Sequence, residues 1–254
     1  MPVEVWARPR TPPRAVQRGQ AASLLIALEA LTLMVPGVTD SRSALVTGGT
    51  GRVGGAVAAR LEADGFRVLA AGRRDGDLSD PRAAAALVAR AAEELGGLDL
   101  VVHAASDGFT PKPVEEVREE DWDAAFGATA KGSFFVGQAA APHLRASDLG
   151  LLVLVEDVAA YQPWPSFAPH CAAKAAQAML TRVLARALAP DVRVCGVAPG
   201  PVAVEPDQEE RRASETLLQR TGSPDDVAEA VVYLVRAAFV TGTSLVVDGG
   251  RLLR

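Results

Sequence analysis

From residue 43 onward, short apolar segments alternate with longer alanine-rich stretches, and this alternation restricts the chain to very few folds. The apolar segments have the length and the Val and Leu content of strands, while the stretches between them have the length of helices. Strands that alternate with helices form a parallel sheet covered by helices on both faces, and such buried strands are apolar throughout. The sequence therefore predicts an α/β fold, a doubly wound parallel sheet, with strands at residues 44–47, 66–71, 98–103, 151–155, 192–197 and 244–247.

Residues 43–254 contain neither an internal repeat nor a linker, so we expect them to form one domain. Residues 1–42 differ, with basic residues and prolines up to residue 20 and an apolar run at 21–35. This outline is typical of a targeting segment, but Glu29 interrupts the run and no clear cleavage site follows. The run is also shorter than the ~20 residues that cross a membrane. We expect residues 1–42 to be an N-terminal extension, helical or partly irregular, on a cytoplasmic protein that does not enter a membrane.

The composition excludes several functional classes. With 254 residues, 49% of them hydrophobic, the chain can bury a core and is not expected to be disordered. A net charge of −5, without a basic cluster in the domain, argues against a nucleic-acid partner. The two cysteines, Cys171 and Cys195, form no CxxC pair and the three histidines are scattered, so neither a disulfide framework nor a metal site is expected.

The first predicted strand leads into a glycine-rich segment, TGGTGRVG at residues 47–54, and a helix is expected to begin near Arg52. Glycines let a backbone turn tightly beside a pyrophosphate, and a helix N-terminus presents unpaired N–H groups to an anion. The alternative is a glycine-rich turn without a ligand, but the position between a strand and a helix favours a dinucleotide site of the Rossmann type. The predicted cofactor contacts here are Gly48, Thr50, Gly51, Arg52, Val53 and Gly54.

The second predicted strand ends in Ala71-Gly72-Arg73-Arg74. NAD-binding folds place an acidic residue here for the ribose hydroxyls, whereas an arginine accommodates the 2′-phosphate of NADP. Guanidinium groups bind phosphate bidentately and remain charged. Arg73 and Arg74 therefore favour NADP(H) over NAD(H), the alternative being that both are solvated surface arginines.

With these motifs in place, residues 43–254 resemble the short-chain dehydrogenase/reductase family. The nucleotide loop carries Arg52 where most members have glycine, as in the pteridine-reductase branch. The resemblance implies that Asp77 and Leu78 meet the adenine, that Ala104 and Ala105 form the turn beside the cofactor, and that a loop lies against the nicotinamide. That loop includes Pro199, Gly200 and Val202. The segments Thr241-Gly242 and Val247-Asp248-Gly249-Gly250 match the family's C-terminal strand and tail.

The catalytic positions depart from the family's Asn, Ser, Tyr and Lys. Lys174 is in place and also serves as a cofactor contact, but the Tyr position four residues earlier is His170. Asp157 stands at the Ser position, as in the pteridine-reductase branch, and Thr129 at the Asn position. His103 is expected in the turn after its strand, where the family has Asn. The resemblance implies Asp157, His170, Lys174 and Thr129 as the candidate catalytic residues.

His170 replaces a phenol with an imidazole, which titrates near pH ~6.5. One interpretation makes Asp157 and His170 an acid–base pair, with Lys174 holding the nicotinamide ribose. The alternative is that His170 only fills space in a degenerate site. Tyr161 follows Asp157 and could swing toward the site, whereas Cys171 turns to another helix face and is expected to be structural.

Two functions remain open. The first is an NADP(H)-dependent oxidoreductase that reduces a carbonyl or imine. The resemblance implies that Trp164, Pro165 and Phe167 line a pocket for an apolar or planar substrate, the alternative being that they serve only packing. The second is a nucleotide-binding or scaffolding protein on the same fold without redox activity. The resemblance also implies a homodimer or homotetramer that pairs through helices near residues 124–141 and 172–188, and a polar lid at 203–216.

Overall fold

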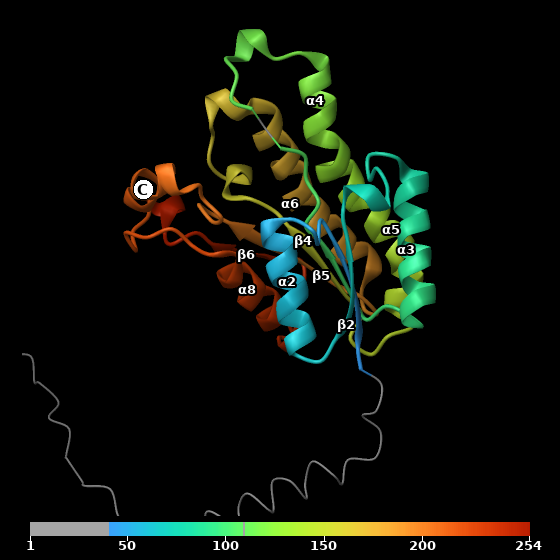
Figure 1. Ribbon diagram of the computed structural model, residues 1–254. Helices are drawn as coiled ribbons and strands as arrows, with labels where there is room; N and C mark the ends of the chain where they lie inside the picture. The colour runs from blue at the N-terminus through green and yellow to red at the C-terminus, as the bar shows by residue number, and fades with distance from the viewer. Residues whose placement is uncertain (1–40, 109) are drawn as a thin grey trace, which may run out of the picture. The chain divides into compact units, whose positions relative to one another are not determined.

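The computed structural model describes residues 41–108 and 110–254. These residues form one six-stranded parallel sheet in the order β2-β1-β3-β4-β5-β6 (Figure 1). β4 and β6 have the expected ranges, whereas β3 begins later and β5 continues to Pro199. The strands are β1 (Ser43–Thr47), β2 (Arg67–Ala71), β3 (Leu100–His103), β4 (Leu151–Val155), β5 (Arg193–Pro199) and β6 (Ser244–Val247).

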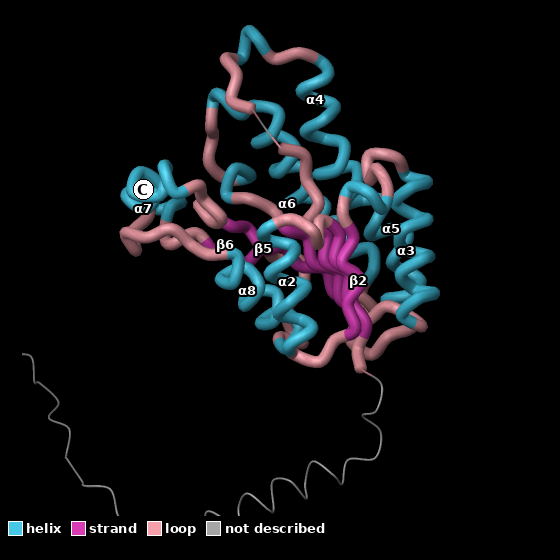
Figure 2. The backbone as a smooth tube through the Cα atoms, viewed as in Figure 1, coloured by secondary structure: helices cyan, strands magenta, loops and turns pink. Residues whose placement is uncertain are grey.

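Helices cover both faces of this sheet, so the fold is the expected doubly wound α/β type. One apolar core lies between the sheet and α2 (Arg52–Ala63) and α8 (Pro224–Arg236). The opposite core packs against α3 (Pro81–Leu95), α5 (Gly132–Arg145) and α6 (Ala168–Leu188). Figure 2 shows the strands enclosed between these helices. Alternate residues of the central strands serve the two cores, which explains why the middle residues of these strands are apolar on both faces.

The helix expected at residues 124–141 is interrupted. Its residues are divided between α4 (Glu119–Phe126), a π-helical turn at Gly127–Lys131, and α5. Gly127 packs closely there, because a Cβ atom would lie 3.0 Å from the Cβ of Ser79. Single π-helical turns are frequent at functional sites, and this one contains Thr129.

Four strands end at one edge of the sheet and lead into the segments that carry the predicted site. β1 lies between β2 and β3, so the connections after β1 and β3 leave the sheet in different directions, and sheets of this type bind ligands at such a point. The loops after β1, β3, β4 and β5 contain Gly48, Ala104, Asp157 and Gly200, respectively.

The predicted extension at residues 1–42 lies outside the described residues, except for Ser41 and Arg42. Among the described residues, no helix is both long enough and apolar enough to span a bilayer. The predicted lid segment contains the short helix α7 (Glu209–Ser214).

Candidate functional site

The glycine-rich loop forms a backbone cradle at the end of β1. Gly48 has φ of +70°, and a Cβ atom on it would lie 2.6 Å from the carbonyl oxygen of Ala104. A Cβ on Gly54 would lie 2.2 Å from the carbonyl oxygen of Gly48. Glycine is therefore required for the loop, the start of α2 and the turn after β3 to pack together. These contacts bring Ala104 and the predicted loop together, as the resemblance implied.

The N-terminus of α2 opens onto this cradle. Gly51 is its N-cap residue and provides no side-chain cap, so the first N–H groups of α2 remain available for a ligand. Such N–H groups, together with the helix dipole, form an anion site. The cradle therefore fits the pyrophosphate of a dinucleotide, with Gly51, Arg52 and Val53 at the helix start.

Arg52 and Thr50 have partners that the sequence did not reveal. Arg52 Nη2 lies 2.9 Å from Glu205 Oε1, which links the nucleotide loop to the predicted lid, and both side chains are largely exposed. A Cβ on Gly72 would lie 2.3 Å from Thr50 Oγ1, so Thr50 packs directly against the end of β2. The loop expected to bind the pyrophosphate and the turn expected to bind the adenine ribose are therefore adjacent.

Arg73 and Arg74 lie exposed in the short turn after β2. The acidic residue of this turn, Asp75, accepts hydrogen bonds from Gly72 N at 2.8 Å and Arg90 Nη2 at 2.6 Å. These two bonds hold the pKa of Asp75 below its usual value, the backbone bond having the larger effect. The Asp75 carboxylate is thus engaged by hydrogen bonds to Gly72 and Arg90. The exposed charges of the turn are those of Arg73 and Arg74.

Asp77 and Leu78 follow this turn, where the resemblance placed the adenine contacts. Asp77 Oδ1 accepts from Ser79 N at 2.9 Å, and its hydrogen bonds with Ser79 lower the pKa of the carboxyl. Leu78 is buried in the core beside α3 and α5. Both residues are thereby fixed next to the turn that carries Arg73 and Arg74.

A single face of α6 carries four buried polar residues, His170, Lys174, Gln177 and Thr181. Their spacing of three and four residues places them along one stripe. This stripe faces the end of β4: Lys174 Nζ donates to Val155 O at 3.0 Å and to Gln177 Oε1 at 3.0 Å. The helix therefore presents its polar groups to the sheet instead of an apolar surface.

His170 and Asp157 meet as the sequence predicted. His170 Nε2 lies 3.4 Å from Asp157 Oδ2, and the histidine is buried while the aspartate is half-buried. Asp157 is held in place by its other oxygen, which accepts from Ala159 N at 2.7 Å. Burial lowers the pKa of Lys174, while the nearby carboxylates of Asp157 and Glu156 act in the opposite direction.

Thr129 is linked to Lys174 through its backbone. Ser133 Oγ donates to the carbonyl of Thr129 at 2.5 Å and accepts from Gln177 Nε2 at 2.9 Å. Gln177 in turn accepts from Lys174, so a buried chain of hydrogen bonds connects the π-helical turn to the ammonium group. Neither Gln177 nor Ser133 was among the predicted site residues.

His103 ends β3, as the strand predicted at residues 98–103 implies, and does not lie in the turn where the resemblance placed it. It is fully buried, with Nε2 2.9 Å from Ala128 O and Nδ1 2.9 Å from Thr47 Oγ1. Because a carbonyl can only accept, the proton lies on Nε2 and Thr47 donates to Nδ1. Burial lowers the pKa of His103 to about 4, so the side chain is neutral and serves packing.

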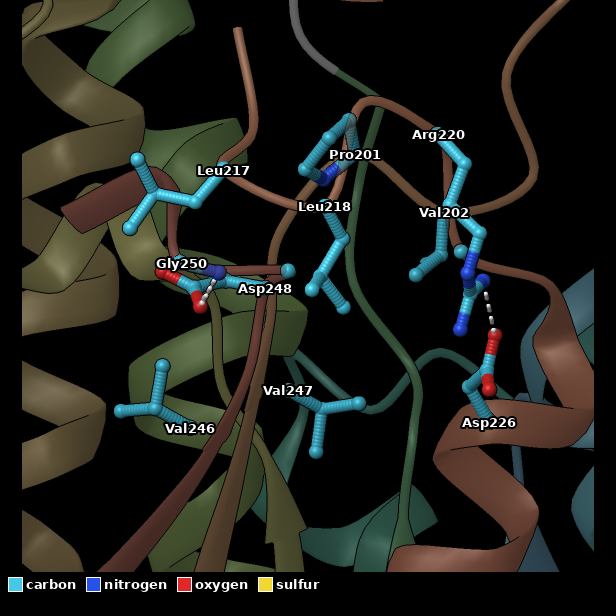
Figure 3. A pocket seen from close by; sticks show the side chains of 12 residues that line it. Pro201, Val202, Leu217, Leu218, Arg220, Asp226, Val246, Val247, Asp248 and Gly250 are labelled. Carbon is cyan, nitrogen blue, oxygen red and sulfur yellow. Dashed lines mark hydrogen bonds and ion pairs between the residues drawn. The ribbon is translucent and has the colours of Figure 1, made fainter. Parts of the chain in front are cut away.

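The loop expected beside the nicotinamide follows β5, and Pro199 is the last residue of that strand. A Cβ on Gly200 would lie 2.7 Å from the Cα of Asp248, so this loop packs tightly on the end of β6. Beyond Pro201 and Val202 lies an open cavity of about 410 Å³, bordered by Leu217, Leu218 and the Arg220–Asp226 ion pair (Figure 3). This cavity is not lined by Asp157, His170 or Lys174.

A smaller cavity, of about 170 Å³, adjoins His170. Phe167 and Pro169 line it together with Lys112 and Asp121, which form an ion pair. Phe167 therefore borders a cavity beside His170. Trp164 and Pro165 do not line this cavity, and Trp164 instead stacks under Arg251, whose Cζ lies 5.0 Å from the ring centroid.

Tyr161 does not turn toward His170. Its hydroxyl donates to Glu156 Oε2 at 3.1 Å, and burial is the main cause that raises the pKa of Tyr161.

Cys171 Sγ faces Trp164 O at 3.9 Å, as expected of a structural residue. Among the described residues, no group of three His, Cys, Asp or Glu side chains could hold a metal ion.

Comparison with known proteins agrees with this architecture. A family model described as "Enoyl-(Acyl carrier protein) reductase" matches residues 55–251. A relative from Streptomyces violaceoruber, named as a ketoacyl reductase of the granaticin polyketide synthase, is 34% identical over 245 residues, which cover 85% of this chain and 98% of the relative.

Two solved structures are similar over 84% of this chain. A short-chain dehydrogenase of Burkholderia cenocepacia J2315 in complex with NADP matches with a TM-score of 0.77 and 30% identity over 98% of its length. A 3-ketoacyl-(acyl-carrier-protein) reductase of Brucella melitensis complexed with NADH matches with a TM-score of 0.78 and 26% identity over 99% of its length. The chain therefore belongs to the short-chain dehydrogenase/reductase family of oxidoreductases.

Proposed function

We propose that the protein is an NADP(H)-dependent reductase of a small carbonyl or imine compound, with His170 as the group that moves the proton. The observation that carries this proposal is the approach of His170 to Asp157 beside a buried Lys174, at the sheet edge that also holds the glycine cradle. A scaffold without chemistry does not require a buried ammonium group and an imidazole–carboxylate pair at this position.

Each residue has a physical role in this proposal. When bound, the dinucleotide supplies a hydride to the substrate carbon. His170 donates a proton to the substrate oxygen or nitrogen, and Asp157 orients the imidazole through the 3.4 Å contact. Two of the three N–H groups of Lys174 donate to Val155 and Gln177, and the third donates to the nicotinamide ribose. The carbonyl of Thr129 anchors the hydrogen-bond chain that fixes Lys174.

The preference for NADP(H) rests on the turn after β2. Arg73 and Arg74 are exposed at the tip, while the only carboxylate of that turn is engaged by Gly72 and Arg90. The ribose of NAD(H) would therefore lack its usual acidic acceptor here, whereas a 2′-phosphate would meet two guanidinium groups.

The cavity beside His170 indicates the size of the substrate. A cavity of roughly 150 Å³ lined by apolar residues accommodates benzene, and the one here measures about 170 Å³. Phe167 supplies an aromatic wall. A substrate that places one planar ring, or a short apolar chain, beside His170 fits these dimensions.

We also propose that the protein is a homodimer or homotetramer and that it works in the cytoplasm. Met179 and Val183 lie on α6 within the segment expected to pair and are 53% and 49% exposed, although both are apolar. Apolar side chains gathered on one helix face are typical of a protein interface. The cytoplasm is where the dinucleotide is available, and the chain offers no disulfide framework of the kind that exported domains use.

A fluorescence titration of the purified protein with NADPH and, separately, with NADH tests the proposal. We expect NADPH to bind much more tightly than NADH. In the variant with both Arg73→Ala and Arg74→Ala, the affinity for NADPH should fall at least about tenfold, since each arginine–phosphate contact is charge-assisted, while NADH binding should stay unchanged. If neither NADPH nor NADH bound, the result would contradict the proposal and favour a non-redox scaffold.

A further inference from the structure

Glu156 is a buried carboxylate outside the group of predicted site residues. It directly follows the apolar strand β4 and is only 2% exposed. Its backbone N–H donates to Val197 O at 2.7 Å, which continues the pairing of β4 with β5. Because Leu152 and Leu154 point into the core on the α6 side, the next alternate residue, Glu156, also faces α6.

Two hydroxyl groups hold the carboxylate from different segments. Thr181 Oγ1, on the polar stripe of α6, donates to Oε1 at 2.6 Å, and the Tyr161 hydroxyl donates to Oε2 at 3.1 Å. Glu156 thereby fixes α6 and the turn that begins at Asp157 to the end of the sheet. Oε1 occupies the space of a side chain on β5, since a Cβ on Gly196 would lie 2.1 Å from it.

This arrangement requires a balancing charge. A buried carboxylate is costly unless it is both hydrogen-bonded and paired with a cation, and the partners of Glu156 that the structure shows are neutral hydroxyls. Lys174 is buried on the same stripe of α6, and its two hydrogen bonds also end on neutral oxygens. Glu156 and Lys174 thus lie on the same side of the sheet, next to the end of β4, and the hydrogen bonds that the structure shows for each end on neutral groups.

We propose that Glu156 is a positioning residue of the active site, whose carboxylate fixes the Asp157 turn against α6 and supplies a second negative charge for the buried ammonium group of Lys174. The first negative charge is Asp157 itself. The other titratable groups that face this cluster are His170 on α6, His103 at the end of β3, Tyr161 in the turn and, beside Tyr161, Arg182.

The electrostatics agree with the geometry. Burial lowers the pKa of Lys174, and the negative charges of Asp157 and then Glu156 raise it again. Glu156 also contributes to the raised pKa of Tyr161, so that the phenol stays protonated and continues to donate its hydrogen bond. Removal of this charge should therefore make the ammonium form of Lys174 less stable while the surrounding hydroxyls change little.

A double-mutant cycle tests the charge pairing without any activity. Urea unfolding at neutral pH should show that Glu156→Gln destabilises the wild-type chain but costs little or nothing in a Lys174→Met background, where the buried cation is absent. Gln keeps the shape of Glu156, and Met keeps the apolar stem of Lys174, so both variants are expected to fold. Equal destabilisation in the two backgrounds would overturn the proposal.

A pH profile tests the role in the active site, and this part rests on the proposed function. NADPH affinity should decline on the alkaline side as Lys174 loses its proton, and Glu156→Gln should move this decline at least about half a pH unit lower. Tyr161→Phe is the matched control, because it removes one hydrogen bond and keeps the carboxylate. Tyr161→Phe should lower the free energy of unfolding without changing the pH at which NADPH affinity declines.

The two tests separate the possible failures. If the wild-type protein binds no nucleotide while the unfolding cycle shows coupling, the proposed function fails and the pairing of Glu156 with Lys174 stands. If nucleotide binds but its pH profile is the same in Glu156→Gln and the wild type, Glu156 is only structural and the inference is overturned.

Discussion

At the scale of single residues, the histidine at position 170, where the family has tyrosine, is accompanied by a second carboxylate that the sequence analysis did not single out. Asp157 Oδ2 lies 3.4 Å from His170 Nε2. The residue before it, Glu156, is also acidic and is buried. The site therefore holds two carboxylates near Lys174. An imidazole that takes and returns a proton is suited to such surroundings, because a carboxylate balances the charge it acquires.

His170→Ala should reduce turnover at least about 10²-fold, the usual effect of removing a general acid or base. NADPH affinity should be nearly unchanged, because His170 is assigned to the proton and not to the cofactor. Steady-state kinetics on a carbonyl substrate, with a parallel nucleotide titration, measures both quantities. Unchanged turnover in the variant would show that His170 only fills space.

His103 should make the protein sensitive to mild acid. Its pKa is lowered by burial from 6.5 to about 4, so the unfolded chain binds a proton at a higher pH than the folded chain does. Stability is therefore complete above about pH 6.5 and declines as the pH falls toward 4, by at most roughly 3 kcal/mol. Urea unfolding between pH 5 and 7.5 should show this decline, and His103→Gln should show a flatter profile even though it is less stable at pH 7. A slope that persists in His103→Gln would assign the acid sensitivity to other groups.

At the scale of elements, the loop after β1 was predictable because its requirements are local. A tight turn, a close backbone approach and a helix start depend on glycines at fixed spacing, and those glycines are visible in the sequence. The polar stripe of α6 was only half predictable. His170 and Lys174 came from the family pattern, whereas Gln177, Thr181 and Ser133 gain their roles from how α5 and α6 pack on β4. Spacing along α6 would have shown that Gln177 and Thr181 share a face with Lys174, but not which groups face them.

Gly54→Ala and Gly55→Ala form a matched pair that tests the cradle. A Cβ on Gly54 would collide with the carbonyl of Gly48. A Cβ on Gly55 would lie 3.4 Å from the carbonyl oxygen of Gly49, which is an ordinary contact. Gly54→Ala should lower both thermal stability and nucleotide affinity. Gly55→Ala should be neutral, or stabilising by up to about 1 kcal/mol, because it replaces a glycine inside α2. Thermal unfolding with and without NADPH gives both results, and similar behaviour of the two variants would show that the loop is not packed as described.

At the scale of the whole molecule, the described domain leaves apolar side chains of α6 exposed on the surface opposite its polar stripe. Two of them, Met179 and Val183, are four residues apart and therefore adjacent on the helix. The sequence predicted the helix and its alanine content, but not which of its residues remain uncovered once the domain has formed. That distinction depends on the complete arrangement of α5 and α6 around the sheet.

Replacing both Met179 and Val183 with Glu should dissociate the expected oligomer, since two charges would enter an apolar contact. Sedimentation velocity should show a smaller species than the wild type at equal concentration. Val114→Glu is the control, because Val114 is also exposed and apolar but lies near α4 instead of α6. A wild-type protein that sediments as a monomer would remove the basis for this interface.

The contact between Glu156 and Gly196 also has an evolutionary consequence. An acidic side chain at position 156 occupies the volume that any larger residue at position 196 would need. Position 196 lies on β5 and position 156 directly follows the neighbouring strand β4, so we expect the two to change together during divergence. Relatives that share the histidine at position 170 can be sorted by this pair: those with an acid at 156 and glycine at 196 inherit the same buried charge arrangement, and those that have lost either residue must stabilise their lysine in another way.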